Sequence, residues 1–248
     1  MQKKYSQMRN GQHNGLKILF EDDWVIVVEK PEGLLTVSTG RQGETTAYSI
    51  LTDYMRSKTA KGHRQVGIYI VHRLDRDTSG LLIFAKDEET RAMLQEGWQD
   101  LVTERRYTAI VEGHTADEEG WIESWIYENP RSMKVHCYHM EPGDDPERPP
   151  QKGWQYASTH CRTIRKGTYE GRPFSQIDVE LETGRKNQIR VHCSWIGHPI
   201  AGDRKYGAES NPLGRLGLHA SAVTFTHPRT GRQMRFTSPI PRRFKKIW

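Results

Sequence analysis

The sequence has few cysteines and no long run of apolar residues. Its three cysteines, Cys137, Cys161 and Cys193, are far apart and include no C-x-x-C pair. This argues against a disulfide framework or a zinc ribbon. No segment approaches the ~20 apolar residues of a membrane-spanning helix. The first fifteen residues are polar and lack the apolar centre of a signal peptide. We therefore expect a cytoplasmic protein with free thiols and no membrane association.

The charge balance is basic. Lys and Arg number 37 against 31 Asp and Glu, which gives a formal net charge of +6. Such a balance suits a polyanionic partner, and arginine fits phosphate through its planar fork of donors. Apolar residues make up only 35% of the chain, but 248 residues are enough to bury a sizeable core.

The most informative stretch is residues 71–86, V-H-R-L-D-R-D-T-S-G-L-L-I-F-A-K. A dense group of charged residues precedes an apolar run, 81–85, that is short enough to be a buried strand. Residues 78–80, Thr-Ser-Gly, are a turn signal between the two. A charged loop beside a buried strand can present catalytic groups at the floor of a cleft. A salt-bridged surface turn would produce the same pattern.

The remaining chain predicts an α+β fold, with a mixed, largely antiparallel sheet flanked by helices. The expected strands are 16–20, 24–30, 81–85, 104–113, 121–126, 133–138, 154–165, 173–182 and 216–226. The expected helices are 46–57, 88–99 with Asp87 as N-cap, and 188–196 with Asn187 as N-cap.

Three parts of the chain are expected. Residues 1–15 read as a flexible tail, 16–240 as one domain, and 241–248 as a basic end that either contacts a polyanionic partner or is merely solvated. Residues 58–64 predict a mobile basic loop. The acidic, proline-rich segment 141–150 predicts a disordered excursion within the domain.

Several motifs resemble one known family. His72 to Gly80, H-R-L-D-R-D-T-S-G, resembles the H-R-L-D-x-x-T-S-G signature of the RluA family of RNA pseudouridine synthases. Further segments follow the family's order, and the resemblance spans roughly residues 16–239. These segments are V-V-E-K-P-E-G-L-L-T-V (27–37), R-R-Y-T-A-I-V-E-G (105–113), T-G-R-K-N-Q-I-R-V-H (183–192), G-H-P-I-A-G-D (197–203) and L-G-L-H-A (216–220).

The resemblance implies an isomerase that turns a specific uridine of structured RNA into pseudouridine, in ribosomal large-subunit RNA, transfer RNA or both. The implied catalytic aspartate is Asp75, while Asp77 matches no fixed acid and is assigned to structure. Arg190 matches the arginine that pairs with the catalytic carboxylate. Tyr107 matches the tyrosine that packs on the flipped uracil and can help to remove its carbon 5 proton.

Other positions are implied to bind substrate. Arg73 resembles an arginine that occupies the gap left by the departing base, and Leu218 would pack under the uracil. Arg185 and Lys186, beside a helix start, suit phosphate. The family more often has histidine where this chain has Asn187. The reaction is a redox-neutral isomerisation, so no metal or organic cofactor is expected, and a monomer is favoured.

Two other classes of function stay open at this point. An RNA-binding protein without activity would use the same basic surface, although binding alone would not require a carboxylate facing a polyanion. A metal-dependent nuclease or phosphotransferase could use Asp75 and Asp77, which share a side if the backbone there is extended. That class predicts a strict Mg²⁺ requirement, which EDTA would reveal.

Overall fold

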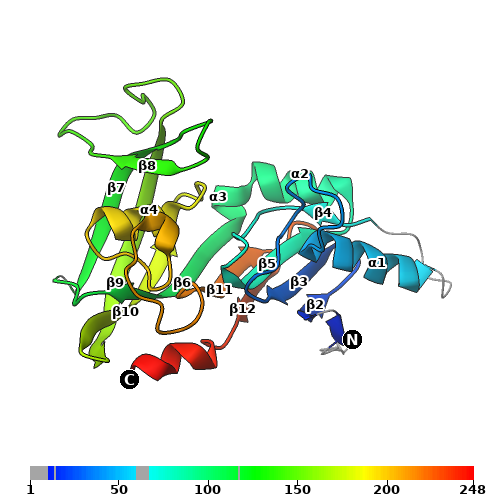
Figure 1. Ribbon diagram of the computed structural model, residues 1–248. Coiled ribbons are helices and arrows are strands. Elements are labelled where there is room, and N and C mark those ends of the chain that lie inside the picture. The colour runs from blue at the N-terminus through cyan, green and yellow to red at the C-terminus, as the bar shows by residue number, and fades with distance from the viewer. Residues whose placement is uncertain (1–10, 14, 60–66, 117) are drawn as a thin grey trace. The chain divides into compact units, whose positions relative to one another are not determined.

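The chain forms two compact units, each built on antiparallel strands (Figure 1). The structure is a computed structural model that describes residues 11–13, 15–59, 67–116 and 118–248. The first unit contains the described residues up to Thr103 together with Ala220–Ser238. The second unit contains Glu104–His219 and Pro239–Trp248. A single domain over 16–240 stays a prediction.

The first unit has its strands in the order β1, β2, β3, β5 and β11, with β12 on β11 and β4 on β5. The strands are β1 (Gly11–His13), β2 (Leu16–Glu21), β3 (Val25–Lys30), β4 (Tyr69–Ile70), β5 (Ser79–Ala85), β11 (Leu218–Thr226) and β12 (Gln233–Thr237). The pairs β1–β2, β2–β3, β3–β5, β4–β5 and β11–β12 are all antiparallel. The start of β11, Leu218 and His219, belongs to the second unit.

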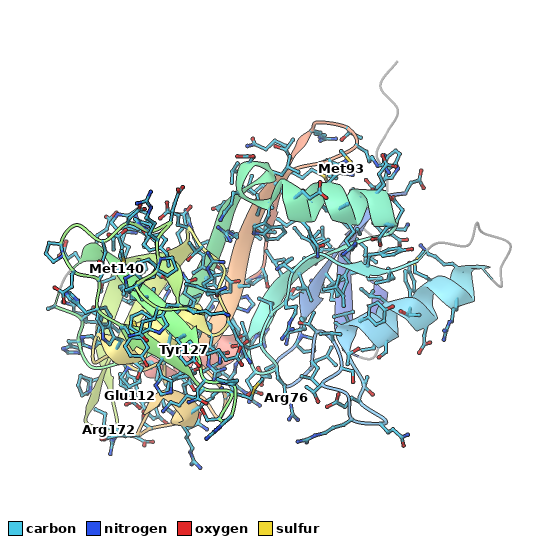
Figure 2. All side chains as sticks on the ribbon, turned by 90° about the horizontal axis from the view of Figure 1, so that it is seen from above. Arg76, Met93, Glu112, Tyr127, Met140 and Arg172 are labelled. Carbon is cyan, nitrogen blue, oxygen red and sulfur yellow. The ribbon has the colours of Figure 1, made fainter. Side chains whose placement is uncertain are left out.

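Strands β3 and β5 are buried on both faces along most of their length, because residues 25–28 and 81–85 are apolar. On one face Val27 and Ile83 pack in a cluster with Leu94 of α2 (Glu88–Glu96). Helix α1 (Ala47–Thr59) confirms the helix expected at 46–57, and Figure 2 shows α1 and α2 on opposite sides of these strands.

Asp87 caps α2 as expected, since its Oδ1 accepts a hydrogen bond from the Thr90 N–H at 2.7 Å. The helix ends earlier than the expected residue 99, because Gly97 separates it from a short helix, α3 (Trp98–Leu101).

The second unit has the strand order β6, β10, β9, β7, β8. The strands are β6 (Val102–Glu112), β7 (Glu119–Glu128), β8 (Val135–Tyr138), β9 (Gln155–Tyr169) and β10 (Arg172–Leu181). The first two residues of β6 belong to the first unit. Helix α4 (Gln188–Trp195) packs on one face, where Ile189 and Cys193 join Ala109 and Val111 in a buried cluster.

The opposite face of this sheet is covered near one end by the 3₁₀ helix η2 (Arg242–Ile247). Phe244 and Ile247 are buried there in a cluster with Ile110 and Phe174. Because adjacent strand residues point to opposite faces, this cluster lies across the sheet from the one under α4. The segment expected as a basic end is therefore a packed helix, and the expectation of a merely solvated end is wrong.

Other expectations differ in detail. The turn expected at 78–80 lies instead at Arg76–Asp77, and Ser79 and Gly80 already belong to β5. The hairpin of β9 and β10 is longer than expected, because Glu170 and Gly171 both adopt positive φ (50° and 76°) and close a two-residue turn.

The segment 141–150 forms turns, one of which is held by a 2.9 Å hydrogen bond from the Trp125 indole N–H to Asp144. Most of the expected tail 1–15 lies outside the described residues, although 11–13 form β1. Most of the expected mobile loop 58–64 lies outside them too, and the described residues 58 and 59 belong to α1. The α+β class with a mostly antiparallel sheet is confirmed.

Gly80 is required where β5 passes Ala220. Its φ is +116°, and an added Cβ would lie 2.2 Å from the Ala220 carbonyl oxygen. We expect Gly80→Ala to lower the free energy of unfolding by about 2–5 kcal/mol, measured by urea denaturation.

The matched control is Gly171→Ala. Its φ is also positive, at +76°, but nothing lies within 4 Å of an added Cβ. It should cost only the backbone strain of about 1–2 kcal/mol. Equal losses at both positions would show that the close approach to Ala220 is unimportant.

Candidate active site

The loop that carries Asp75 is tied down by a buried ammonium group. Lys30, the last residue of β3, has no exposed surface. Its Nζ donates to the carbonyl oxygens of Pro31 (3.0 Å), Leu34 (2.7 Å) and Arg76 (3.0 Å). A buried charge is costly unless it is compensated, and three carbonyl dipoles supply that compensation. The ammonium thus joins the turn after β3 to the residue that follows Asp75.

The residue that precedes Asp75 is held from the same turn. The Thr36 hydroxyl donates to the Leu74 carbonyl at 2.8 Å and accepts from the Leu74 N–H at 3.2 Å. In addition, the Arg76 Nε donates to the Gly33 carbonyl at 3.2 Å. Both neighbours of Asp75 are therefore held by hydrogen bonds to residues of the segment 30–36. This segment begins with K-P-E-G, which resembles the family's K-P-x-G motif.

The start of this loop is fixed against β5. The Ile83 N–H donates to His72 Nε2 at 3.0 Å, so this nitrogen must be unprotonated, and the His72 ring lies 4.9 Å from the Trp98 ring. Arg73 is exposed and Asp75 is half-buried. The structure thus places both expected residues on one loop with a fixed backbone.

Helix α4 is anchored by two buried polar side chains. Gln188 Oε1 accepts from the Thr183 hydroxyl (2.8 Å) and the Arg185 N–H (2.9 Å), and its Nε2 donates to Ser158 O (2.9 Å) and Thr159 Oγ1 (2.8 Å). One turn later, His192 lies between the hydroxyls of Ser124 (2.9 Å) and Thr159 (2.8 Å).

Burial lowers the pKa of His192 to about 4, so its imidazole is neutral at physiological pH. A neutral ring can both donate and accept, which suits its two hydroxyl neighbours. Gln188 and His192 are four residues apart and therefore face β9 together. They are anchors of the helix.

Arg190 lies between these anchors and takes part in a different network. Its Nε and Nη2 donate to the two carboxylate oxygens of Asp203 at 2.7 and 2.8 Å, and Asp203 is only 2% exposed. The guanidinium lies 5.1 Å from the centre of the Tyr206 ring. The resemblance implies a pairing with the catalytic carboxylate. That pairing stays a prediction, whereas the bidentate pair with Asp203 is a feature that sequence reasoning missed.

Asn187 is the N-cap residue of α4, as expected, but it does not cap the helix with its side chain. Its φ of 53° places it in the left-handed region, and its side chain makes no capping hydrogen bond. Instead its Nδ2 donates to the Tyr206 hydroxyl at 2.9 Å, and its Oδ1 accepts from Arg190 Nη1 at 3.3 Å. Asn187 therefore joins the network around Arg190, and Asn tolerates the left-handed conformation better than most residues.

Tyr107 and Leu218 pack against the same buried cluster as Ile189 of α4. Tyr107 is half-buried and Leu218 is 3% exposed. Arg185 and Lys186 are exposed at the start of α4. Arg185 Nε donates to Tyr156 O at 3.0 Å, and Lys186 forms an ion pair with Glu128. Phosphate binding by these two cations stays a prediction.

The expected site residues divide between the two units. Arg73 and Asp75 belong to the first, whereas Tyr107, Arg185, Lys186, Arg190 and Leu218 belong to the second. Among the described residues, no group of three or more His, Cys, Asp or Glu side chains is arranged to hold a metal ion. No helix in that part of the chain is long and apolar enough to cross a membrane. Burial raises the pKa of Cys137 to about 11 and that of Cys161 to about 12.

A comparison with known families accounts for these motifs. The sequence profile of the RNA pseudouridylate synthase family matches residues 24–195. The chain belongs to this family, the RluA-type RNA pseudouridine synthases, and is an isomerase that acts on RNA.

Individual relatives cover most of the chain. YjbO of Bacillus subtilis, an uncharacterized RNA pseudouridine synthase, is 31% identical over 94% of this chain and 75% of its own length. The dual-specificity RNA pseudouridine synthase RluA of Vibrio parahaemolyticus is 34% identical over 86% of this chain and 78% of its own. The ribosomal large subunit pseudouridine synthase D of Nitrosomonas europaea is 35% identical over 91% of this chain and 62% of its own.

A solved structure has the same fold. Human RNA pseudouridylate synthase domain containing 4 superposes with a TM-score of 0.71 at 23% identity, covering 93% of this chain and 90% of that one.

Asp203 is expected to stabilise the second unit through Arg190. Its side chain is 1% exposed and that of Arg190 is 12% exposed, so an Asp203→Asn change leaves a largely buried cation without its countercharge. We expect the free energy of unfolding to fall by about 3–5 kcal/mol in urea denaturation.

The control is Asp53→Asn, which makes the same change in an exposed pair. Arg56 and Asp53 are 77% and 74% exposed. Solvent screens such a pair, so the unfolding midpoint should hardly move. A loss at Asp203 no larger than at Asp53 would contradict the structural role of the buried pair.

Proposed function

We propose that the enzyme isomerises a specific uridine in structured RNA, in ribosomal large-subunit RNA or transfer RNA, with Asp75 as the catalytic carboxylate. The observation that carries the proposal is the fixed backbone on both sides of Asp75, held by Lys30 and Thr36. A rigid loop is what an enzyme needs to hold a reacting group in position. Two relatives, one named a ribosomal large subunit synthase and one a dual-specificity synthase, support the choice of RNA class.

The reaction needs a carboxylate at the junction of ribose and base. The bond between uracil nitrogen 1 and the ribose breaks, and the base turns and rejoins through carbon 5. Carbon 5 loses a proton and nitrogen 1 ends with one, so the atoms balance. Asp75 serves as nucleophile at the anomeric carbon or as base on the sugar. A carboxylate that stabilises a cationic, oxocarbenium-like sugar has a parallel in glycoside hydrolysis.

Uridine in a folded RNA is stacked, so the base must be flipped into the site. Unstacking costs a few kcal/mol, which contacts to the flipped base repay. In this proposal Tyr107 packs on the uracil and its hydroxyl helps to remove the carbon 5 proton. Leu218 contacts the base and Arg73 occupies the gap that the base leaves. Arg185 and Lys186 contact phosphate.

In this proposal Arg190 pairs with the carboxylate of Asp75 and orients it. The same guanidinium donates to Asp203 and to Asn187, which fixes its position. The proposal requires Asp75 from one unit and Arg190 and Tyr107 from the other to act on the same nucleotide.

The first test replaces the carboxylate. Asp75→Asn should reduce pseudouridine formation at least about 10³-fold, because loss of a central catalytic group usually costs that much or more. Carbodiimide labelling and primer extension on ribosomal and transfer RNA would map the modified site. The RNA would come from a strain in which the gene for this protein is deleted, and from the same strain after either the parent protein or the Asp75→Asn variant has been reintroduced.

Asp77→Asn is the matched control, since it makes the same change two residues away on the same loop. It should keep the rate within a few fold of the parent. Turnover that survives Asp75→Asn would refute the assignment, and a site that is absent with the parent enzyme too would point to another RNA.

The second test concerns the Tyr107 hydroxyl. Tyr107→Phe keeps the ring that packs on the buried cluster, so the fold and RNA affinity should be retained. Loss of proton transfer by a positioned group should lower the single-turnover rate by about 10²–10⁴-fold. An unchanged rate at unchanged affinity would leave Tyr107 with a packing role alone.

A further inference from the structure

Helix η2 carries four cations on a fixed frame. Arg242, Arg243, Lys245 and Lys246 are exposed, whereas Phe244 is fully buried and Ile247 is 3% exposed. A 3₁₀ helix has three residues per turn, so Phe244 and Ile247 lie one above the other and the other positions face outward. The buried pair thus anchors the helix and presents the basic residues to solvent.

Two aromatic side chains lie among these cations. The guanidinium of Arg165, on β9, is 4.1 Å from the centre of the Trp248 ring. An added Cβ at Gly167 would lie 2.5 Å from that ring, so Trp248 rests directly on the strand. Lys246 Nζ lies 5.4 Å from the centre of the Tyr169 ring. Trp248 remains 36% exposed.

One more arginine lies at the tip of the same hairpin. Arg172 is opposite Tyr169 in the register of β9 and β10, so the two side chains share a face. Arg172 is 3.6 Å from Glu209, and both side chains are more than half exposed. We call the set Arg165, Arg172, Arg242, Arg243, Lys245 and Lys246 the η2 basic surface; Figure 1 shows η2 beside the ends of β9 and β10.

The part of the chain that forms η2 has no acidic residue of its own, and in the η2 basic surface Arg172 is paired with Glu209. No Asp or Glu occurs after Glu209, so all the charged side chains of η2 and of the segment that leads to it are Arg or Lys. Like charges held close together repel and destabilise the folded state. A ligand with many negative charges would remove that repulsion.

We propose that the η2 basic surface binds the RNA substrate at a second place, through its phosphates and through stacking of a base on Trp248. An exposed aromatic ring beside arginines, here that of Trp248, favours nucleic acid, because a phosphate group alone would use only the cations. The inference rests on RNA being the substrate, as in the proposed function.

This contact is separate from the one that receives the uridine. Helix η2 packs on Ile110 and Phe174, whereas Tyr107 packs with Ala109 and Val111 on the face under α4. Since these are opposite faces of one sheet, the η2 basic surface binds a different segment of the RNA. It therefore contributes to affinity and to the choice of RNA, and takes no part in the chemical step.

The test removes the four charges of η2 and leaves its anchors in place. The variant is Arg242→Gln, Arg243→Gln, Lys245→Gln and Lys246→Gln together. Binding of fluorescently labelled bulk transfer RNA would be followed by anisotropy at several salt concentrations. All proteins would carry Asp75→Asn, so that no turnover occurs.

Each phosphate contact adds about 0.7–0.9 to the slope of log affinity against log salt. Loss of four contacts should therefore reduce the slope by about 3 and weaken binding at least about tenfold near 0.1 M salt. A second measurement uses proteins that keep Asp75 and are therefore active. There the fourfold η2 variant should have the same single-turnover rate as the parent at saturating enzyme, but a higher half-saturating enzyme concentration.

The matched control removes four exposed cations elsewhere: Arg56→Gln, Arg131→Gln, Arg148→Gln and Lys152→Gln. It changes the net charge equally, so a similar loss in both variants would mean that only total charge matters and would overturn the proposal. No loss in the η2 variant would do the same. Thermal unfolding checks that both variants fold. If the fourfold η2 variant does not fold, the double variant Arg242→Gln/Lys245→Gln replaces it, and this variant should reduce the slope by about half as much.

Because this readout is equilibrium binding, it is independent of pseudouridine formation. A failed η2 test with an active enzyme refutes only the second RNA contact. Bound RNA without any pseudouridine in the parent enzyme refutes only the proposed function.

Discussion

The ammonium of Lys30 is the constraint on which the first unit's loops depend. A lysine with no exposed surface must satisfy three N–H donors inside the protein, and it does so with the carbonyls of Pro31, Leu34 and Arg76. Those carbonyls belong to two loops that are more than forty residues apart in the sequence. Removing the ammonium would orphan all three, so the turn after β3 and the loop with Asp75 form one rigid piece. Lys30, the first residue of the K-P-E-G segment, thus supports the loop that bears Asp75.

The second unit uses the same principle with neutral groups. Gln188 and His192 satisfy their polar atoms against β9 and its neighbours, and their burial leaves α4 only one position on the sheet. Arg190, midway between them, is directed to Asp203 and Tyr206 as a consequence. Three polar residues of one motif therefore have two different physical roles, and residue spacing along the helix separates them.

Sequence reasoning found the elements whose periodicity is clear, such as β3, β5, α1 and the β9–β10 hairpin. It also found the Asp87 cap, because capping depends on local chemistry. It placed Asn187 correctly at the N-cap position but missed the role of its side chain, whose partners Tyr206 and Arg190 are set by the tertiary structure. It missed Lys30 and Asp203 because a buried charge is recognised only by its distant partners. The η2 helix was misjudged since its two apolar residues look few until Ile110 and Phe174 are seen beneath them.

The anchoring of α4 has a consequence for how the chain tolerates changes in length. Adding one residue between Gln188 and His192 would rotate the later side chains of α4 by about 100° relative to the earlier ones, so Gln188 and His192 could not both reach β9. The segment 141–150 consists of exposed turns, and its Asp144 accepts a hydrogen bond from the buried Trp125 indole. An insertion after Asp144, in 146–150, leaves that bond in place. The first segment therefore does not tolerate a change in length, whereas the second does. Insertions and engineered tags are therefore expected to be tolerated in 146–150, where they leave the position of α4 on the sheet unchanged.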